Sequence, residues 1–168
     1  MSDDKLLIEV ANGSKKAFEE LYNLYSSKVY SLAFRYSGVR EDAEEITTDV
    51  FVKVWQNAKK FRGNSKVSTW IYRITVNTAL EYKRKRKPEE VEIDEEIIST
   101  QNENTSGTDQ EIIALALRKL PEKQRIAIIL TQIENYSYKE ASRIMGKSIK
   151  AIESLVQRGK ETLRRLLT

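Results

Sequence analysis

The sequence predicts an all-α protein of two small helical domains joined by a flexible acidic linker, the C-terminal domain being a helix-turn-helix. Three observations support this fold class. Apolar residues recur every three or four positions along most of the 168 residues, which is the period of a helix. The chain contains only two prolines and six glycines, so few positions interrupt helices. The charges also divide into blocks along the chain.

These charge blocks predict the domain boundaries. Residues 1–88 contain 17 basic and 11 acidic side chains, a net charge of +6. Residues 89–108 contain seven acidic side chains and no basic one, as expected of a linker. Residues 109–168 contain 12 basic and seven acidic side chains, a net charge of +5. Two basic domains beside an acidic connector indicate two contacts with a polyanion.

The composition excludes several classes of function. The absence of cysteine excludes disulfides and thiolate zinc sites, and it is typical of the reducing cytoplasm. Histidine, the commonest general base and metal ligand, is also absent. No phosphate-binding or calcium-binding loop motif is present, so we expect no catalytic residue, metal, cofactor or small-molecule substrate. No apolar run approaches the roughly 18 residues of a membrane span, and the N-terminus lacks a signal-peptide pattern. We expect a soluble cytoplasmic protein without membrane insertion.

The first three helices are predicted from apolar spacing and capping residues. A short helix over residues 4–11 is followed by Ser14, which can cap a long helix that Gly38 ends. A third helix is predicted over residues 40–59. The expected inner faces of the second and third helices consist of Phe18, Leu21, Tyr22, Tyr25, Val29, Leu32, Ala33 and Tyr36, and of Ala43, Ile46, Val50, Phe51, Val54 and Trp55.

The third helix begins with an acidic exposed face. Acidic residues in a first turn are explained by the helix dipole alone. The run nevertheless continues to Asp49, beyond the reach of the dipole. This extension favours a surface that binds a partner.

A fourth helix over residues 67–85 follows a break at residues 61–65 and stops before Pro88. One edge of this helix combines polar and aromatic side chains with the basic run of residues 83–87. Aromatic and Arg faces that stack on bases, beside lysines that follow a backbone, are typical of single-strand binding. Cations also suit a helix C-terminus, but five in succession exceed that need. Trp70 either stacks on a base or packs in the core, and its phase with Ile74 favours the core.

The C-terminal domain begins with two predicted helices. Thr108 and Glu111 form a potential capping box for a helix that extends to about residue 119. Pro121 is suited to the start of a helix over residues 122–132.

Two further helices meet at a tight turn. Ser137 and Glu140 form a second potential capping box, Gly146 ends the short helix, and Ser148 caps a long basic one. An ordinary helical hairpin would share the apolar spacing. The two capping serines and the turn glycine favour a DNA-binding helix-turn-helix, in which the second helix enters the major groove.

The order of four segments resembles that of the extracytoplasmic-function (ECF) sigma factors, the two-domain class of bacterial transcription initiation factors. These segments are DAEEITTDVFVKVW, FRGNSKVSTWIYRITVNTALEY, LPEKQRIAIIL and YSYKEASRIMGKSIKAIESLVQRGKETL. The resemblance covers nearly the whole chain and is weakest in residues 89–108. It implies three partners: core RNA polymerase through its β′ coiled coil and β flap, promoter DNA, and an anti-sigma factor.

The resemblance also implies roles for individual residues. The polymerase-binding surface would consist of Asp42, Glu45, Ile46 and Asp49. Strand capture at the −10 element, with a flipped base received by the loop, would use Arg62, Gly63, Asn64, Ser65, Lys66, Arg73, Asn77, Lys83 and Arg84. Recognition of the −35 duplex would use Ser148, Lys150, Glu153, Ser154, Gln157, Arg158, Lys160 and Arg164.

The chain departs from the family pattern at two places. Thr47 and Thr48 stand where an apolar residue followed by Gln is more frequent. Ser142 stands where the helix-turn-helix usually has a small apolar residue, and its hydroxyl is expected to bond back to its own helix.

A conventional dimeric helix-turn-helix regulator is the alternative. It would explain the C-terminal domain equally well, but not the acidic helix, the 61–65 loop or the basic edge, and no sustained heptad offers a dimer seam.

Overall fold

The computed structural model describes residues 2–85 and 109–167, and the regular structure within these ranges is helical throughout. The N-terminal half consists of α1 (Asp3–Ala11), α2 (Lys15–Ser37), α3 (Arg40–Asn57), the 3₁₀ turn η1 (Ala58–Lys60) and α4 (Val67–Lys85). The C-terminal half consists of α6 (Asp109–Leu117), α7 (Glu122–Ile128), the π-helical turn η2 (Ile129–Ile133), α8 (Tyr138–Met145) and α9 (Ile149–Leu167). The predicted all-α class is confirmed. The linker, residues 89–108, and the capping box at Thr108 lie outside the described residues.

The predicted helix ends are confirmed where capping chemistry defined them. The Ser14 hydroxyl accepts a hydrogen bond from the Ala17 amide at 3.1 Å, so it satisfies a backbone donor at the start of α2. Gly38 ends α2 with a φ of 72°, a left-handed conformation that glycine adopts without steric cost. The third helix is shorter than predicted, because its last turn tightens into η1.

The core of the N-terminal half lies between α2, α3 and α4. Leu21, Ile46 and Ile71 are fully buried there. Tyr22 and Trp55, which were predicted on inner faces, are 42% and 39% exposed. Each instead lies at the rim of the core, where its ring makes an edge contact with a phenylalanine. A large ring at a rim buries one face while the other remains in water.

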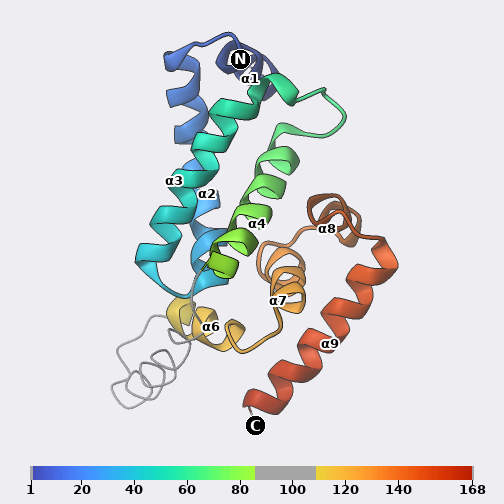
Figure 1. Cartoon of the computed structure of the whole chain (residues 1–168). Coiled ribbons are helices and arrows are strands. Elements are labelled where there is room, and N and C mark those ends of the chain that lie inside the picture. The colour runs from blue at the N-terminus through green and yellow to red at the C-terminus, as the bar shows by residue number, and fades with distance from the viewer. Residues whose placement is uncertain (1, 86–108, 168) are drawn as a thin grey trace.

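The two halves pack against each other. Figure 1 shows α4 beside α7 and α8, and α6 beside α2. The contact is apolar at its centre, where a small cavity of about 20 Å³ remains. Its lining consists of Leu32, Tyr36, Thr75, Val76 and Ala79 from the N-terminal half, and of Ile126, Ile129 and Leu130 from the C-terminal half. Among the described helices, none combines the length and the apolar character needed to cross a membrane.

Candidate nucleic-acid and protein interfaces

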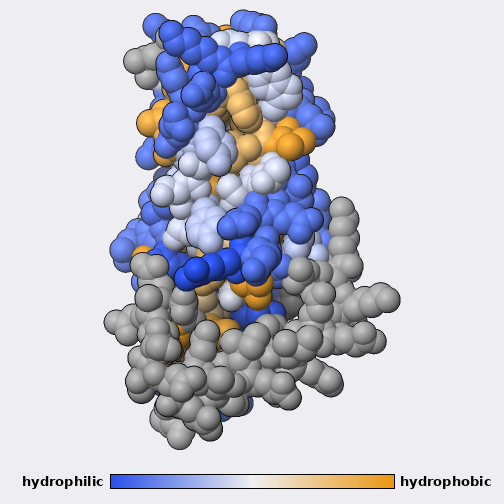
Figure 2. Space-filling view, turned by 90° about the vertical axis from the view of Figure 1, so that its left-hand side faces the viewer, coloured by the Kyte–Doolittle hydropathy of each residue, from blue (hydrophilic) through white to orange (hydrophobic). Residues whose placement is uncertain are grey.

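The acidic surface lies on α3, on the outer side of the N-terminal half. Glu45 and Asp49 are exposed there, and Val52, one turn further along, is 47% exposed. In Figure 2, which views the side that α3 occupies at the left of Figure 1, hydrophobic patches form small islands in a largely hydrophilic surface. An apolar residue beside two carboxylates is suited to a partner that offers both cations and apolar contact.

Asp42 and Ile46, predicted as members of this surface, lie inside the fold instead. Ile46 is fully buried, and Asp42 is 4% exposed. The physical reason is the helical period: both positions face inward in phase with Ala43 and Val50. The Tyr82 hydroxyl of α4 donates to Asp42 Oδ1 at 3.0 Å, and Glu45 Oε2 lies 2.9 Å from the same hydroxyl.

The unusual threonine pair of α3 is accommodated within the helix. Thr47 is buried, and its hydroxyl donates to the Ala43 carbonyl at 2.7 Å. Thr48 is exposed and donates to the Glu44 carbonyl at 3.0 Å. These bonds to the preceding turn satisfy both hydroxyls, so the departure from the family pattern leaves the helix intact.

The predicted strand-capture loop between η1 and α4 is open to solvent. Arg62, Gly63, Asn64 and Lys66 are exposed, and Ser65 is half-buried. Gly63 has a φ of 77°, and no atom lies within 4 Å of a Cβ built on it. The loop therefore presents polar groups around an unobstructed turn. Such a loop has room for a base and donors for its edges.

Arg73 and Asn77 lie one turn apart on the exposed face of α4, as predicted. Arg73 is engaged, however: its guanidinium donates twice to the backbone carbonyl of Arg143 in α8, with Nε at 3.0 Å. The C-terminal half thus occupies a residue predicted to contact DNA. The side chains of Lys83 and Arg84 lie outside the described residues.

Trp70 packs against the core from the start of α4. Its ring meets Phe61 at 5.7 Å in an edge contact, and the side chain is half-buried. This position supports the core interpretation over base stacking.

The helix-turn-helix has the predicted geometry. Ser137 and Glu140 form both bonds of the capping box at the start of α8. Gly146 ends α8 with a φ of 65°, and the Ser148 hydroxyl accepts from the Ala151 amide at 3.1 Å at the start of α9. Ser142 differs from expectation, because its hydroxyl donates to the Lys147 carbonyl in the turn rather than to its own helix. That bond ties α8 to the turn.

All predicted recognition residues of α9 are exposed. They are Ser148, Lys150, Glu153, Ser154, Gln157, Arg158, Lys160 and Arg164. The opposite face buries Ile152 and Val156 against the domain, while Gly159 lies against α7. The helix therefore presents a polar and mainly basic face of almost its full length.

Glu134, which was not predicted as a site residue, links the two halves. Its side chain is 4% exposed and forms ion pairs with Lys28 and Arg35, both from α2. Tyr136, two residues later, packs its ring 5.8 Å from that of Tyr72 on α4. Burial raises the pKa of Tyr72, and burial together with the nearby Tyr72 and Glu134 raises the pKa of Tyr136. Both tyrosines remain neutral hydrogen-bonding groups at physiological pH.

Arg125 forms a second polar link. Its guanidinium donates to the Tyr36 carbonyl at the end of α2 at 2.9 Å, and to the carbonyls of Arg118 and Leu120 at 2.9 and 3.0 Å. It also lies 4.8 Å from the centre of the Tyr36 ring. Burial lowers the pKa of Arg125, yet arginine stays charged in proteins. This cation therefore stabilises the C-terminal end of α2, where the helix dipole is negative.

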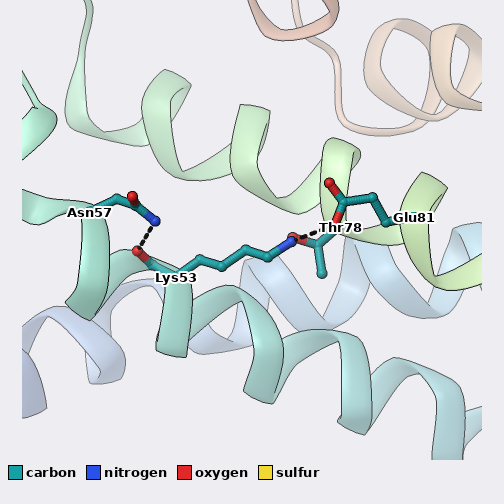
Figure 3. A network of polar contacts seen from close by, with 4 residues as sticks. All are labelled: Lys53, Asn57, Thr78 and Glu81. Carbon is teal, nitrogen blue, oxygen red and sulfur yellow. Dashed lines mark hydrogen bonds and ion pairs between the residues drawn. The ribbon is translucent and has the colours of Figure 1, made fainter.

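Sequence reasoning missed the groups that join elements. Lys53 of α3 reaches α4, where it donates to Thr78 at 3.1 Å and pairs with Glu81 at 2.9 Å (Figure 3). One available signal was the presence of Arg125 and Glu134 at the two ends of an apolar run, since charged residues flanking buried segments require partners.

Comparisons with known proteins agree with this arrangement. The Sigma-70 region 2 family model matches residues 21–89, and the Sigma-70 region 4 model matches residues 110–163. The chain is 32% identical to the ECF RNA polymerase sigma-E factor of Escherichia coli strain K12, over 97% of this chain and 93% of that protein. It is 29% identical to the ECF RNA polymerase sigma factor SigW of Bacillus subtilis, over 97% and 95%.

Two solved structures are similar over nearly their whole length. CnrH in complex with the cytosolic domain of CnrY matches with a TM-score of 0.74 and 25% identity, covering 98% of this chain and 96% of that one. The sigma factor RpoE in complex with the anti-sigma factor NepR from Bartonella quintana matches with a TM-score of 0.70 and 26% identity, covering 90% and 97%.

Proposed function

Because the chain belongs to the ECF RNA polymerase sigma factors of the sigma-70 family, we propose that it binds core RNA polymerase and directs it to one class of promoters. In this proposal residues 1–88 hold polymerase and capture the melted −10 strand, residues 109–168 bind the −35 duplex, and residues 89–108 connect them. The protein acts in the cytoplasm, takes no small-molecule substrate and catalyses no reaction. It supplies binding energy and strand capture.

One observation above all supports this proposal: the continuous exposed polar face of α9 in a fully capped helix-turn-helix. Gln157 and Arg158 have the length and the donors to reach base edges in the major groove. Lys160 and Arg164 lie further along the helix, where a cation can bind phosphate. The −35 element is therefore recognised as duplex.

Strand capture at −10 uses the loop of residues 62–66 and the exposed face of α4. Extruding a base costs a few kcal/mol of lost stacking and pairing. The exposed side chains of Asn64 and Asn77 can offset part of that free-energy cost through hydrogen bonds to base edges. Arg73, Lys83 and Arg84 supply positive charge toward the strand backbone.

The grip on polymerase uses the exposed carboxylates of α3. Glu45 and Asp49 attract a basic segment of the enzyme, the β′ coiled coil, and Val52 adds apolar contact. Asp42 and Ile46 act from within by fixing the helix. The helix-turn-helix domain contacts the β flap.

Promoter binding requires the two halves to separate. Elements about twenty base pairs apart lie about 68 Å from each other along B-DNA. The packing of α8 against α4 keeps the two DNA-binding surfaces adjacent, and it occupies Arg73. We infer that polymerase holds the halves apart, and that an anti-sigma factor binds the free protein and keeps it inactive. The similar sigma factor RpoE forms a complex with the anti-sigma factor NepR.

A pull-down with purified core RNA polymerase tests the proposal. Wild-type protein should bind in stoichiometric amounts. The affinity of Glu45→Lys/Asp49→Lys should be lower by a factor of at least about ten, because reversed charges repel a basic partner. The matched control is Glu19→Lys/Glu20→Lys, which reverses two exposed carboxylates of α2 and should bind normally.

Two results would contradict the proposal. Equal binding by the charge-reversed variant would show that the carboxylates of α3 do not bind polymerase. Absence of polymerase binding, together with tight duplex binding by a dimer, would establish the conventional regulator instead.

A further inference from the structure

The hydroxyl of Tyr82 lies between two carboxylates of α3. Its oxygen is 3.0 Å from Asp42 Oδ1 and 2.9 Å from Glu45 Oε2. A phenol has a single proton, so it donates to one carboxylate at a time. The contact therefore has two forms, and they differ in which carboxylate accepts the hydrogen bond.

The two carboxylates differ in their surroundings. Asp42 is almost completely buried, whereas Glu45 is exposed on the acidic surface. Removing a hydrogen-bond donor from a buried charge costs more than removing it from a solvated one. The bond to Asp42 therefore contributes mainly to stability, whereas the bond to Glu45 fixes a carboxylate of the acidic surface.

A second polar link joins α3 and α4 close to the Tyr82 hydroxyl. A few residues away, Lys53 crosses from α3 to α4 and contacts Thr78 and Glu81, while the Asn57 amide donates to the Lys53 carbonyl at 2.8 Å (Figure 3). The same two helices line an open groove of about 560 Å³, with Glu45 and Tyr82 among its lining residues. Two links thus fix α4 against α3 beside the acidic surface.

We propose that Tyr82 is a positioning residue for polymerase binding, whose hydroxyl holds the Glu45 carboxylate in place on the acidic surface. This inference rests on the proposed function of that surface. An exposed glutamate otherwise loses rotamer freedom when a partner binds it. The bond leaves Glu45 Oε1 available to a cation, since a carboxylate has several acceptor sites. Tyr82 also joins the polymerase grip to α4, the helix that contains the strand-capture residue Asn77.

A double-mutant cycle tests the proposal with the full-length chain and core polymerase. Tyr82→Phe removes the hydroxyl and keeps the ring that packs against the core. We expect its dissociation constant for polymerase to rise about fivefold to tenfold, the worth of one typical intramolecular hydrogen bond. In a Glu45→Ala background the same change should have less than about a twofold effect, because no carboxylate remains to be held.

A matched control removes a hydroxyl elsewhere. Tyr30→Phe alters α2, where the described contacts include no hydrogen bond from that hydroxyl, and it should leave the dissociation constant unchanged. Thermal unfolding of each variant is measured in parallel. A positioning role predicts coupling to Glu45 in binding, which a purely structural role would not produce.

The outcomes separate the two levels of inference. If wild-type protein does not bind polymerase, the proposed function fails. If wild type binds and Tyr82→Phe binds equally well, only the positioning role is overturned. An equal loss with and without Glu45 would also overturn it, because the hydroxyl would then act through another group.

Discussion

Gly159 shows how a single missing side chain sets the spacing of two helices. A Cβ at this position would lie 2.7 Å from Ile128 Cγ1 and 3.0 Å from Ile128 Cδ1. Isoleucine is branched at Cβ and cannot easily rotate away in a helix. The absent methyl group lets α9 approach α7 closely, and it therefore helps to fix the direction of the recognition helix.

We expect Gly159→Ala to lower the free energy of unfolding by about 1–2 kcal/mol. Overpacking costs about 1–3 kcal/mol, and the better helix propensity of alanine returns up to about 1 kcal/mol. Chemical denaturation measures the change. In an Ile128→Ala background, which removes both contacting carbons, the cost should be smaller. An equal cost there would show that the two positions do not collide.

At the level of elements, capping residues define where the helices of the DNA-binding domain begin. The Glu140 amide donates to the Ser137 hydroxyl at 3.0 Å, and the Ser137 amide donates to the Glu140 carboxylate at 3.4 Å. Such a box fixes the first turn of α8. Because α8 precedes the turn at Gly146, its start also sets the position of α9.

Ser137→Ala should therefore destabilise the first turn of α8 by about 1 kcal/mol, the usual cost of a lost N-cap. The amide of Glu140 should exchange its proton roughly fivefold faster, as measured by hydrogen exchange. Ser27→Ala, on the exposed face of α2, is the control and should change little. Unchanged protection at Glu140 would mean that other contacts hold this turn.

At the scale of the whole molecule, the halves are joined by an apolar contact with charged groups at its edge. The buried carboxylate of Glu134 forms ion pairs with two basic residues of α2, and Arg125 donates a hydrogen bond to a carbonyl at the end of that helix. These contacts compete with the open form that we propose for promoter binding. The interface must consequently be strong enough to form and weak enough to break.

We expect Glu134→Gln to shift the balance toward the open form by about 2 kcal/mol, because a neutral amide replaces a charged acceptor shared by two cations. That shift is roughly thirtyfold in the equilibrium constant. Fluorophores placed on α3 and α9 would report a longer mean distance. Glu161→Gln, the same change at an exposed position of α9, should leave the distance unchanged. An unchanged distance in Glu134→Gln would mean that the apolar contact alone holds the halves together.

The sequence by itself determined the helices, their caps and the helix-turn-helix. The apolar period and the capping residues act through neighbours within one or two turns, so the helices they define can be predicted from the sequence. These capping residues are Ser14, Gly38, Ser137 and Gly146. The exposed face of α9 was predictable for the same reason.

Only the tertiary structure decided which groups meet across elements. Tyr82 lies 40 positions from Asp42, and Arg125 lies 89 positions from Tyr36. No local period specifies such pairs, because they depend on how packed helices are placed relative to one another. The same placement buried Asp42, bonded Arg73 to α8 and brought the two halves together. Helices follow from local chemistry, whereas their mutual contacts follow from the packing of the whole core.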